Sequence, residues 1–572
     1  MCWRHSWTRV SRSGAFALWA LTALTPVAQS QQTIDAKRYV VTSGHPDATA
    51  AGLSVLRAGG NVVDAAITTS LCLGVAEPYA SGIGGKAMLL YRDGKSGQVF
   101  SIEAMCAAPS AIDPKQFAER PRRERYYGYT SVAVPGLVSA LGAAHERWGT
   151  MKWHDLVAPA AELAENGVTV SEKMYQMMRP KRNLLRRQLE AARVYLVDRE
   201  TPAVGTVMKY PDLARTLRMI ADDGPAVFYE GEIAEQIAAA ARLAGAPLTL
   251  ADFRAYKPRI GPPLDAHYDG YRIWTSPPPL TGGSTVLAAL RALDGVAELE
   301  TTDGRDPKYV DLFGRVLLSV YPRVTRTIAD VPMALAEAEA LLRDESVCAI
   351  QKEAESIEPG KADIPAANSS RETTAEQSAE SSTTHLIVAD ADGNIVCLTQ
   401  SLSLHFGACV VTPGTGFLLN NSMSNFSIAD PAGCNYVAPS KRERSTIAPI
   451  IVTRDEKPVL ALGIPGGQRI PTTTVQLLID ILHFGTPLDQ AFDRPRFHVR
   501  RPRGADESRN VVDLEDDAPA DLDDALVAMG WQPVRQRRNG AYFGGGSAVI
   551  YRTDRSLQGV ADLRRTNHAG GE

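Results

Sequence analysis

The sequence has few cysteines for its length, and none of them has the spacing of a metal site. Seven cysteines occur among 572 residues, with no C-x-x-C pair and no histidine-rich segment beside them. Zinc binding is therefore not indicated, and we expect neither a metal nor another cofactor. We expect most of the cysteines to be small buried side chains in a large core.

Neither sign of charge predominates in the chain. Lys and Arg number 61 and Asp and Glu number 65, which gives a formal net charge of −4. A chain so close to balance lacks the basic surface that a nucleic-acid partner requires. Its 44% hydrophobic content excludes collagen, coiled coil and general disorder. Its length indicates two domains or one large layered domain.

Long apolar runs are missing after residue 30. Before it, three arginines precede an apolar stretch at residues 15–27, and small residues follow at Ala28 and Ser30. This pattern predicts a cleaved secretory signal at residues 1–30. A membrane anchor is the alternative, but the stretch is shorter than the roughly 20 residues that span a bilayer. We therefore expect a secreted or periplasmic protein with no membrane partner once the signal is removed.

A glycine-rich turn lies between a predicted helix and a predicted strand. Asn61 is placed to cap a helix at residues 62–75, and the turn at residues 81–85 leads into a strand at residues 87–91. A dinucleotide-binding turn has the opposite order, because it follows a strand and opens a helix. The turn therefore does not indicate nucleotide binding.

The composition changes sharply at residues 352–382. This segment is rich in Glu, Ser, Thr and Ala, and its only large apolar residues are Ile357 and Ile364. Such a segment cannot bury enough surface to offset the entropy of ordering. We expect a mobile tether here.

A β-hairpin is predicted directly after the tether. Residues 383–389 and 395–402 have strand composition, with a turn at residues 390–394. The acidic turn resembles part of an EF-hand loop, but Ile395 and Ser401 stand where that loop needs Gly and Glu. The hairpin therefore begins at a threonine, Thr383, and calcium is not indicated.

A threonine that follows a cleavable tether has a specific chemical use. Its hydroxyl is a weak nucleophile, but a break before Thr383 would give the residue an α-amino group with a pKa of about 7.7–8.0. That amine could act as the base for the hydroxyl. The same hydroxyl could cause the break by attacking the carbonyl of Ser382.

Seven motifs together resemble those of the γ-glutamyltranspeptidases, which are N-terminal-nucleophile (Ntn) hydrolases. The motifs are GGNVVDAA at 59–66, GIGG at 82–85, VPGLV at 134–138, TTH at 383–385, LLNNSMSNF at 418–426, IPGGQRI at 464–470 and PRFHV at 495–499. The resemblance covers nearly all of the chain after residue 30. It implies an α+β fold, the four-layer αββα sandwich, made by a large subunit 31–382 and a small catalytic subunit 383–572 cut from the same precursor.

The resemblance also assigns the catalytic groups. Thr383 would be the nucleophile of both autocleavage and acyl transfer, Thr399 and Ser401 would orient it, and the N–H groups of Gly466 and Gly467 would form the oxyanion hole. Each has a plainer alternative: a threonine that starts a strand, strand hydroxyls that face a neighbour, and a tight turn. The nearby His385 is as consistent with a core histidine as with a functional one.

The residues that would bind the acyl group depart from the family pattern. Ser445 and Thr446 match a hydroxyl pair that contacts the substrate carboxylate. The family's carboxylate-binding arginine falls at Met105, and its aspartate that pairs with the α-ammonium falls at Asn425. Ser422 and Ser403 stand where a glutamine and an asparagine are expected.

Two lost charge-assisted contacts, at about 1.5–3 kcal/mol each, would reduce selectivity for a glutamyl head by roughly two to four orders of magnitude. Three hypotheses follow. The first is an amidohydrolase that transfers a γ-glutamyl-type acyl group from a glutathione-like donor to water, an amino acid or a peptide. The second is the same chemistry on a non-glutamyl acyl amide, of the glutaryl or cephalosporin-acylase kind. The third is a processed binding protein without catalysis.

Overall fold

The computed structural model describes residues 32–300, 302–304, 306–361, 381–503, 507–538, 540 and 542–572. The expected secretory signal and residues 362–380 of the expected tether lie outside these ranges. Within them, no helix combines the length and the apolar character needed to cross a membrane.

Two seven-stranded antiparallel sheets form the centre of the fold. In spatial order, the first contains β1 (Gln32–Ala36), β18 (Leu557–Ala561), β17 (Ser547–Tyr551), β13 (Lys457–Gly463), β12 (Ile450–Arg454), β9 (Tyr271–Thr275) and β8 (Leu264–Tyr268). The second contains β19 (His568–Gly571), β2 (Tyr39–Ser43), β10 (Ser381–Asp390), β11 (Ile395–Leu404), β3 (Lys86–Arg92), β4 (Val99–Ala104) and β7 (Arg259–Gly261). Each sheet contains strands from before and from after Thr383.

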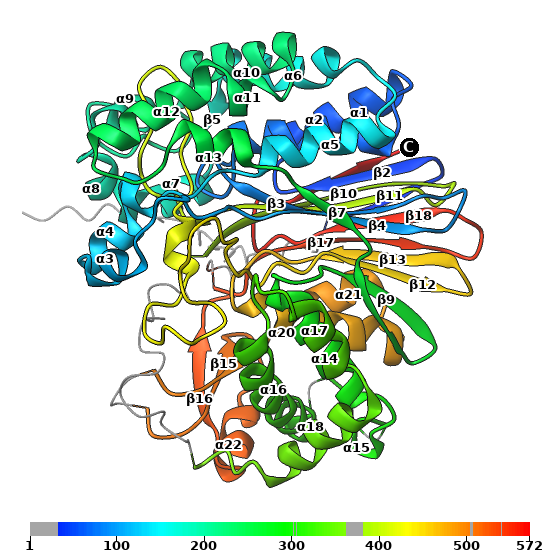
Figure 1. Ribbon diagram of the computed structural model, residues 1–572. Helices are drawn as coiled ribbons and strands as arrows, with labels where there is room; N and C mark the ends of the chain where they lie inside the picture. The colour runs from blue at the N-terminus through cyan, green and yellow to red at the C-terminus, as the bar shows by residue number, and fades with distance from the viewer. Residues whose placement is uncertain are drawn as a thin grey trace, which may run out of the picture. The chain divides into compact units, whose positions relative to one another are not determined.

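Helices cover the outer face of each sheet (Figure 1). Over the second sheet lie α1 (Pro46–Arg57), α2 (Val62–Ala76), α5 (Leu137–Trp148), α6 (Trp153–Asn166) and α10 (Pro211–Asp223). On the outer side of the first sheet lie α14 (Thr281–Leu293) and α20 (Arg469–Leu478), with α16 (Pro307–Thr327) and α18 (Asp344–Ser356) packed on α14. The expected four-layer αββα arrangement is confirmed.

The remaining elements lie around these layers. The other helices are α3 (Pro114–Glu119), α4 (Arg122–Tyr126), α7 (Glu172–Met178), α8 (Arg182–Leu185), α9 (Leu189–Tyr195), α11 (Val227–Glu230), α12 (Glu232–Leu243), α13 (Leu250–Ala255), α15 (Ala297–Glu300), α17 (Ala334–Leu341), α21 (Leu488–Asp493) and α22 (Asp521–Ala528). The other strands are β5 (Val168–Thr169), β6 (Val207–Met208), β14 (Phe497–Arg500), β15 (Val511–Glu515) and β16 (Gln532–Gln536). The last three form a small separate sheet.

The hairpin of β10 and β11 is buried on both faces. Along β10, Leu386 and Val388 pack into the core beneath the α1–α10 layer, while Ile387 and Ala389 pack into the core on the side of the first sheet. Successive side chains of a strand point to opposite faces, so a strand between two layers must be apolar throughout. This explains the continuous apolar runs that predicted the hairpin.

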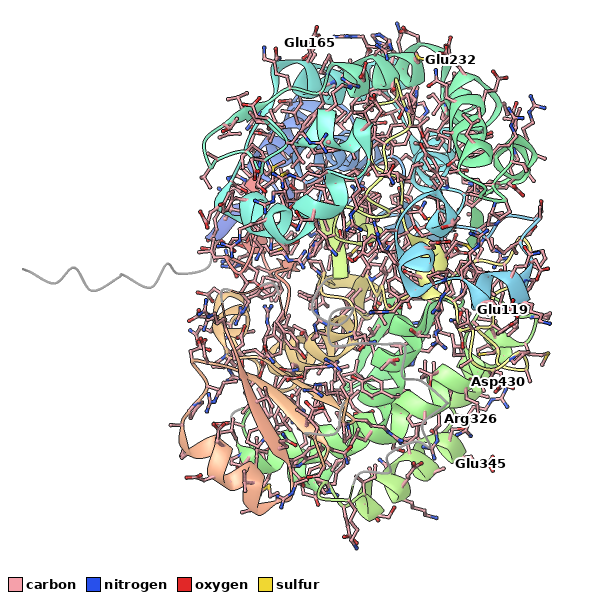
Figure 2. All side chains as sticks on the ribbon, turned by 90° about the vertical axis from the view of Figure 1, so that its left-hand side faces the viewer. Glu119, Glu165, Glu232, Arg326, Glu345 and Asp430 are labelled. Carbon is pink, nitrogen blue, oxygen red and sulfur yellow. The ribbon has the colours of Figure 1, made fainter. Side chains whose placement is uncertain are left out.

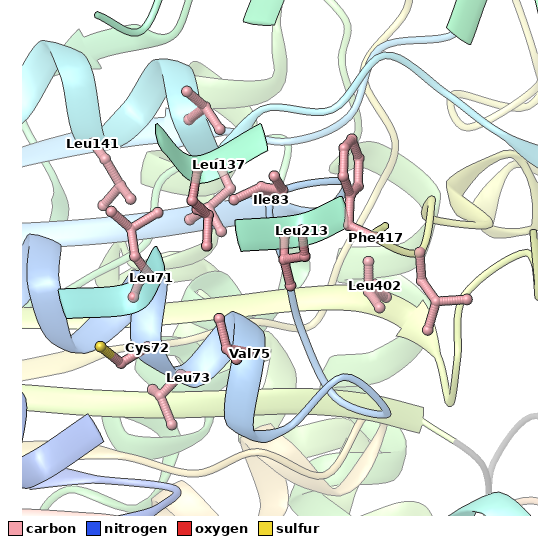
Figure 3. Packing of buried hydrophobic residues seen from close by; sticks show 14 of the residues in the cluster. Leu71, Cys72, Leu73, Val75, Ile83, Leu137, Leu141, Leu213, Leu402 and Phe417 are labelled. Carbon is pink, nitrogen blue, oxygen red and sulfur yellow. The ribbon is translucent and has the colours of Figure 1, made fainter. Parts of the chain in front are cut away.

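Helix α2 is the most deeply placed of the α1–α10 layer. Asn61 caps it as predicted, since its side chain accepts from the Val63 and Asp64 amides. Every residue of the helix except Gly74 is buried. Figure 3 shows why, because its apolar side chains face those of α5 and α10 on one side and the hairpin on the other. Charged side chains such as Glu165, Glu232 and Glu345 lie outside, on exposed helix surfaces (Figure 2).

The expected tether begins too early. Helix α18 continues to Ser356, so residues 352–356 are helical. The side chains of Ile350 and Ala354 are buried, and α18 packs against α16. The polar composition of this segment belongs to the exposed face of an amphipathic helix. Strand β10 also begins two residues earlier than expected, at Ser381.

The cysteines behave largely as expected. Of the six in the described ranges, Cys72, Cys106, Cys397 and Cys409 are buried. Cys348 is exposed and Cys434 is half-buried.

Replacing Leu71 of α2 with alanine should lower the free energy of unfolding by about 2–5 kcal/mol, because the side chain is 1% exposed and would leave a cavity. The matched control is Leu243→Ala in α12, where the leucine is 85% exposed and a change within about 0.5 kcal/mol is expected. Urea titration of both variants measures the difference. Equal losses would contradict the assignment of α2 to the core.

Candidate active site

An irregularity in the pairing of β10 with β11 sets the position of Thr383. Ser382 pairs with Ser403 and Thr384 with Gln400, so Thr383 alone opposes the two residues between them on β11. One of these two is Ser401. Such bulges re-aim side chains and are common beside active sites. Here the bulge brings Ser401 next to the peptide bond that precedes Thr383.

Two hydroxyl groups converge on the carbonyl of Ser382. The Thr383 Oγ1 lies 2.7 Å from this carbonyl oxygen and donates to it. The Ser401 Oγ also donates to it and lies 3.4 Å from Thr383 Oγ1. Thr383 is 3% exposed. The sequence predicted Thr383, Ser401 and Ser382 to act together, and the structure brings all three together.

The backbone on either side of this carbonyl is held by side chains. Ser382 Oγ donates to the carbonyl oxygens of Tyr79 and Ala80, at 2.5 and 2.7 Å. On the other side, Arg565 Nη1 donates to the carbonyl oxygen of Thr383 at 2.7 Å. The peptide bond between the two residues is therefore fixed from both ends.

The next residue is anchored by a buried carboxylate. Thr384 Oγ1 donates to Glu77 Oε2 at 2.6 Å, and Tyr79 donates to the other oxygen of the same carboxylate at 2.6 Å. Sequence reasoning missed Glu77, Tyr79 and Arg565. They come from segments hundreds of residues away, and no local pattern relates them to Thr383.

The glycine-rich turn before β3 allows close approach to the site. A side-chain carbon on Gly85 would lie 2.4 Å from the carbonyl oxygen of Ser401, which only glycine avoids. The GIGG motif is therefore a packing requirement of the strand that carries Ser401.

Thr399 contacts a histidine. Its hydroxyl lies 2.7 Å from Nδ1 of His385, and the other ring nitrogen of His385 lies 3.4 Å from Cys397 Sγ. A side-chain carbon on Gly463 would lie 2.1 Å from this ring, so strand β13 of the neighbouring sheet has a glycine here, which leaves room for the ring. Burial lowers the pKa of His385 to about 3. His385 is thus a neutral core histidine, and the hydrogen bonds of the described residues do not join Thr399 to Thr383.

Gly466 and Gly467 form a turn between β13 and α20. Gly467 has φ of 61°, in the left-handed region that favours glycine. The carbonyls of both glycines accept hydrogen bonds from the amides of Arg469 and Ile470. In a trans peptide the N–H points opposite the C=O, so the Gly467 N–H points away from α20. The described hydrogen bonds do not reach from this turn to Thr383, and its role as an oxyanion hole stays a prediction.

The predicted hydroxyl pair is tied to this turn. Thr446 Oγ1 donates to the Gly467 carbonyl oxygen at 2.8 Å. Ser445 is half-buried, and its carbonyl oxygen accepts from the amide of Thr281 at 2.7 Å.

Ser403, Ser422 and Asn425 form a polar cluster close to Thr383. The Oγ atoms of Ser403 and Ser422 are 3.0 Å apart, and Asn425 Nδ2 donates to Ser403 Oγ at 3.1 Å. The Ser403 amide donates to Ser401 Oγ at 2.9 Å, which links the cluster to Thr383. Ser403 has φ of 81°, a strained value for a serine.

A buried ion pair that the sequence analysis did not identify completes this cluster. Lys86 Nζ donates to Ser403 Oγ at 2.8 Å and to Glu443 Oε2 at 2.6 Å. Asn425 also donates to Glu443. A lysine that opens the apolar strand 86–91 was the available signal, since a buried charge requires a partner.

Met105 does not join these residues. Its side chain is fully buried in a hydrophobic core, its amide donates to Glu103 at 2.7 Å, and its carbonyl accepts from Tyr256 at 2.8 Å. An arginine at this position would be buried in that core.

Comparisons with known proteins agree with this geometry. A family model described as Gamma-glutamyltranspeptidase matches residues 48–571. The glutathione hydrolase proenzyme of Bacillus subtilis (strain 168) is 31% identical over 508 residues, covering 86% of this chain and 84% of that protein. The acylase ACY 1 proenzyme of Pseudomonas sp. (strain V22) is 30% identical over 544 residues and 92% of each chain.

Among solved structures, cephalosporin acylase from Bacillus halodurans aligns with a TM-score of 0.84 at 27% identity, over 96% of this chain and 98% of that one. The fold, the hydroxyl pair on the Ser382 carbonyl and the match over residues 48–571 lead to one assignment. The chain belongs to the γ-glutamyltranspeptidase family of Ntn hydrolases.

Proposed function

We propose that the protein is a self-processing amidohydrolase that transfers an acyl group through an ester on Thr383. The observation that carries this proposal is the 2.7 Å hydrogen bond between Thr383 Oγ1 and the carbonyl oxygen of Ser382. The nucleophile already lies beside the bond that it would break. Ser401 supports the step by donating to the same oxygen, where negative charge would develop.

Self-processing proceeds in two steps. The Thr383 hydroxyl attacks the Ser382 carbonyl carbon, and its proton passes to the departing amide nitrogen as the C–N bond breaks. The product is an ester between Ser382 and the Thr383 side chain, with a free α-amine on Thr383. Water then hydrolyses the ester to leave a carboxylate on Ser382 and the free hydroxyl on Thr383.

The new amine makes the same hydroxyl catalytic. It accepts the hydroxyl proton while Thr383 attacks the carbonyl carbon of an acyl amide, and the leaving amine takes up a proton. The Gly466 and Gly467 amides would stabilise the oxyanion. Water or an amino-acid or peptide acceptor then releases the acyl group from Thr383. A γ-glutamyl-type donor is supported by the relatives named glutathione hydrolase.

A second substrate class has its own support. Asn425 and Met105 stand where the family pattern expects an aspartate and an arginine, and Met105 is buried in the core. A neutral amide cannot form an ion pair with an α-ammonium. The cephalosporin acylase likeness agrees with an acyl group that lacks this amine.

The two products of processing should stay associated. In the second sheet, β10 lies between β11 and β2; its residues from Thr383 onward belong to 383–572, whereas β2 belongs to residues 31–382. Separation would expose the apolar faces of both sheets. We also infer export, on the basis of the secretory signal expected at residues 1–30.

Replacing Thr383 with alanine should leave the precursor as one chain, because no hydroxyl remains to attack Ser382. The wild-type protein should instead yield a fragment whose first residue is Thr383. Gel electrophoresis and N-terminal sequencing of the fragment measure this. Thr383→Ser is the matched control and should still be cleaved, since it retains the hydroxyl. Normal cleavage of Thr383→Ala would falsify self-processing.

Replacing Ser401 with alanine should slow cleavage by about 10²–10³-fold, since one donor to the developing oxyanion is lost. The rate is measured by following the precursor band after synthesis in vitro. Ser401→Thr keeps a hydroxyl and should be cleaved much faster than Ser401→Ala. Equal rates for wild type and Ser401→Ala would exclude this role.

The pH dependence of the mature enzyme should report the Thr383 amine. The amine acts as a base only when neutral, so kcat/KM should rise with pH through a midpoint near about 7.7–8.0. His385 cannot produce this limb, because burial lowers its pKa to about 3 and it stays neutral over the whole range. Steady-state rates between pH 5 and 10 test this expectation. A flat profile over that range would contradict the amine as base.

A further inference from the structure

A buried ion pair ends the chain of polar contacts that starts at the nucleophile. Thr383 Oγ1 lies 3.4 Å from Ser401 Oγ, which accepts from the Ser403 amide at 2.9 Å. The Ser403 hydroxyl accepts from Lys86 Nζ at 2.8 Å, and Lys86 pairs with Glu443 at 2.6 Å. Lys86 is also the direct cross-strand partner of Ser401. The pair is therefore joined to Thr383 through Ser401 and Ser403.

The pair is closed to solvent and its two opposite charges are in contact through Glu443 Oε2, while Glu443 Oε1 accepts no hydrogen bond from the described residues. The side chains of Lys86 and Glu443 are 2% and 0% exposed. Burial, followed by the charge of Glu443, raises the pKa of the neighbouring Cys106 thiol well above its usual value, so the thiol adds no charge. The adjacent Arg442 is paired with Glu103 at 2.7 Å, and both are buried. Lys86 with Glu443 and Arg442 with Glu103 thus form two pairs of opposite charge beside the cluster.

A zwitterionic acyl head gains binding free energy only where it meets opposite charges that lack a partner. Such a head loses its hydration on binding, and a charge that is already paired inside the protein gives little in return. Asn425 cannot supply a missing charge, because it is neutral and its amide nitrogen donates to Ser403 and Glu443. Its side-chain carbonyl oxygen can accept a hydrogen bond from an uncharged donor group of the acyl chain.

Resting on the acyl-Thr383 chemistry above, we propose that an acyl chain on Thr383 extends beside Lys86 and Glu443, and that the mutual neutralisation of these two residues sets acyl specificity by leaving no unpaired charge for an acyl head. Lys86 and Glu443 each meet their opposite charge within the protein, so neither is left to pair with a charge of the acyl group. The preferred acyl chain therefore carries neither an α-ammonium nor an α-carboxylate and ends in an uncharged polar group.

Three p-nitroanilides of the same chain length test this specificity in the mature enzyme. They carry the γ-glutamyl group, the glutaryl group, and the neutral 4-carbamoylbutanoyl group. We expect kcat/KM for the neutral anilide to exceed that for the γ-glutamyl anilide by about tenfold or more, as for an unpaired polar group in a binding site. A preference for the γ-glutamyl anilide would overturn the inference and leave the proposed function standing.

Single substitutions test the pair directly. Glu443→Gln leaves the Lys86 ammonium without its carboxylate partner, so it can attract the carboxylate of the glutaryl group. The ratio of kcat/KM for the glutaryl anilide to kcat/KM for the neutral anilide should therefore rise by about tenfold. The matched control is Arg92→Met, which removes a buried cation from the far end of the same strand and should leave this ratio unchanged. An unchanged ratio in Glu443→Gln would also overturn the inference.

A double variant keeps the test decisive if the single variant does not fold. Lys86→Met with Glu443→Leu removes both charges together, which is tolerated better than leaving one buried charge alone. It should still be cleaved at Thr383 and should keep the preference for the neutral anilide. Loss of that preference would overturn the inference. Failure to turn over all three anilides in the cleaved wild type would instead overturn the proposed function, and the inference with it.

Discussion

The structure depends on one short contact, the hydrogen bond from the Thr383 hydroxyl to the carbonyl oxygen of the preceding residue. Regular strand pairing by itself would not hold the Thr383 hydroxyl beside this carbonyl oxygen. The irregular pairing with β11 brings Ser401 to the same oxygen, and Arg565 fixes the following carbonyl. The two sheets and their helices can be understood as the rigid support of this contact, because small displacements of a nucleophile cost much reactivity.

Burial governs the electrostatics around this contact. Burial keeps His385 neutral, so it carries no charge beside Thr383. Among the charged groups near Thr383, Lys86 and Glu443 stand in direct contact with each other. A self-processing mechanism agrees with this arrangement, because it supplies its base only after the chain is cut. In our proposal, the Lys86–Glu443 pair affects which acyl group binds and takes no part in the transfer of that group.

Local sequence patterns predicted the elements that depend on near neighbours. The capping of α2 by Asn61 and the hairpin of β10 and β11 follow from side-chain periodicity and from turn residues. The start of the tether was wrong, because Ile350 and Ala354 gain their stability from packing against α16. Packing between distant segments leaves little trace in a short window of sequence. The contact of Thr399 with His385 escaped prediction for the same reason.

The sequence by itself marked Thr383 as the candidate nucleophile, since a polar segment precedes a predicted strand that starts at this residue. The matching motifs also determined the family and the four-layer architecture. Only the tertiary structure decided the surroundings of that residue. Lys86 and Glu443 are 357 residues apart, and Thr384 and Glu77 are 307 apart. Charge pairing acts through space, so its partners are known only once the chain is folded.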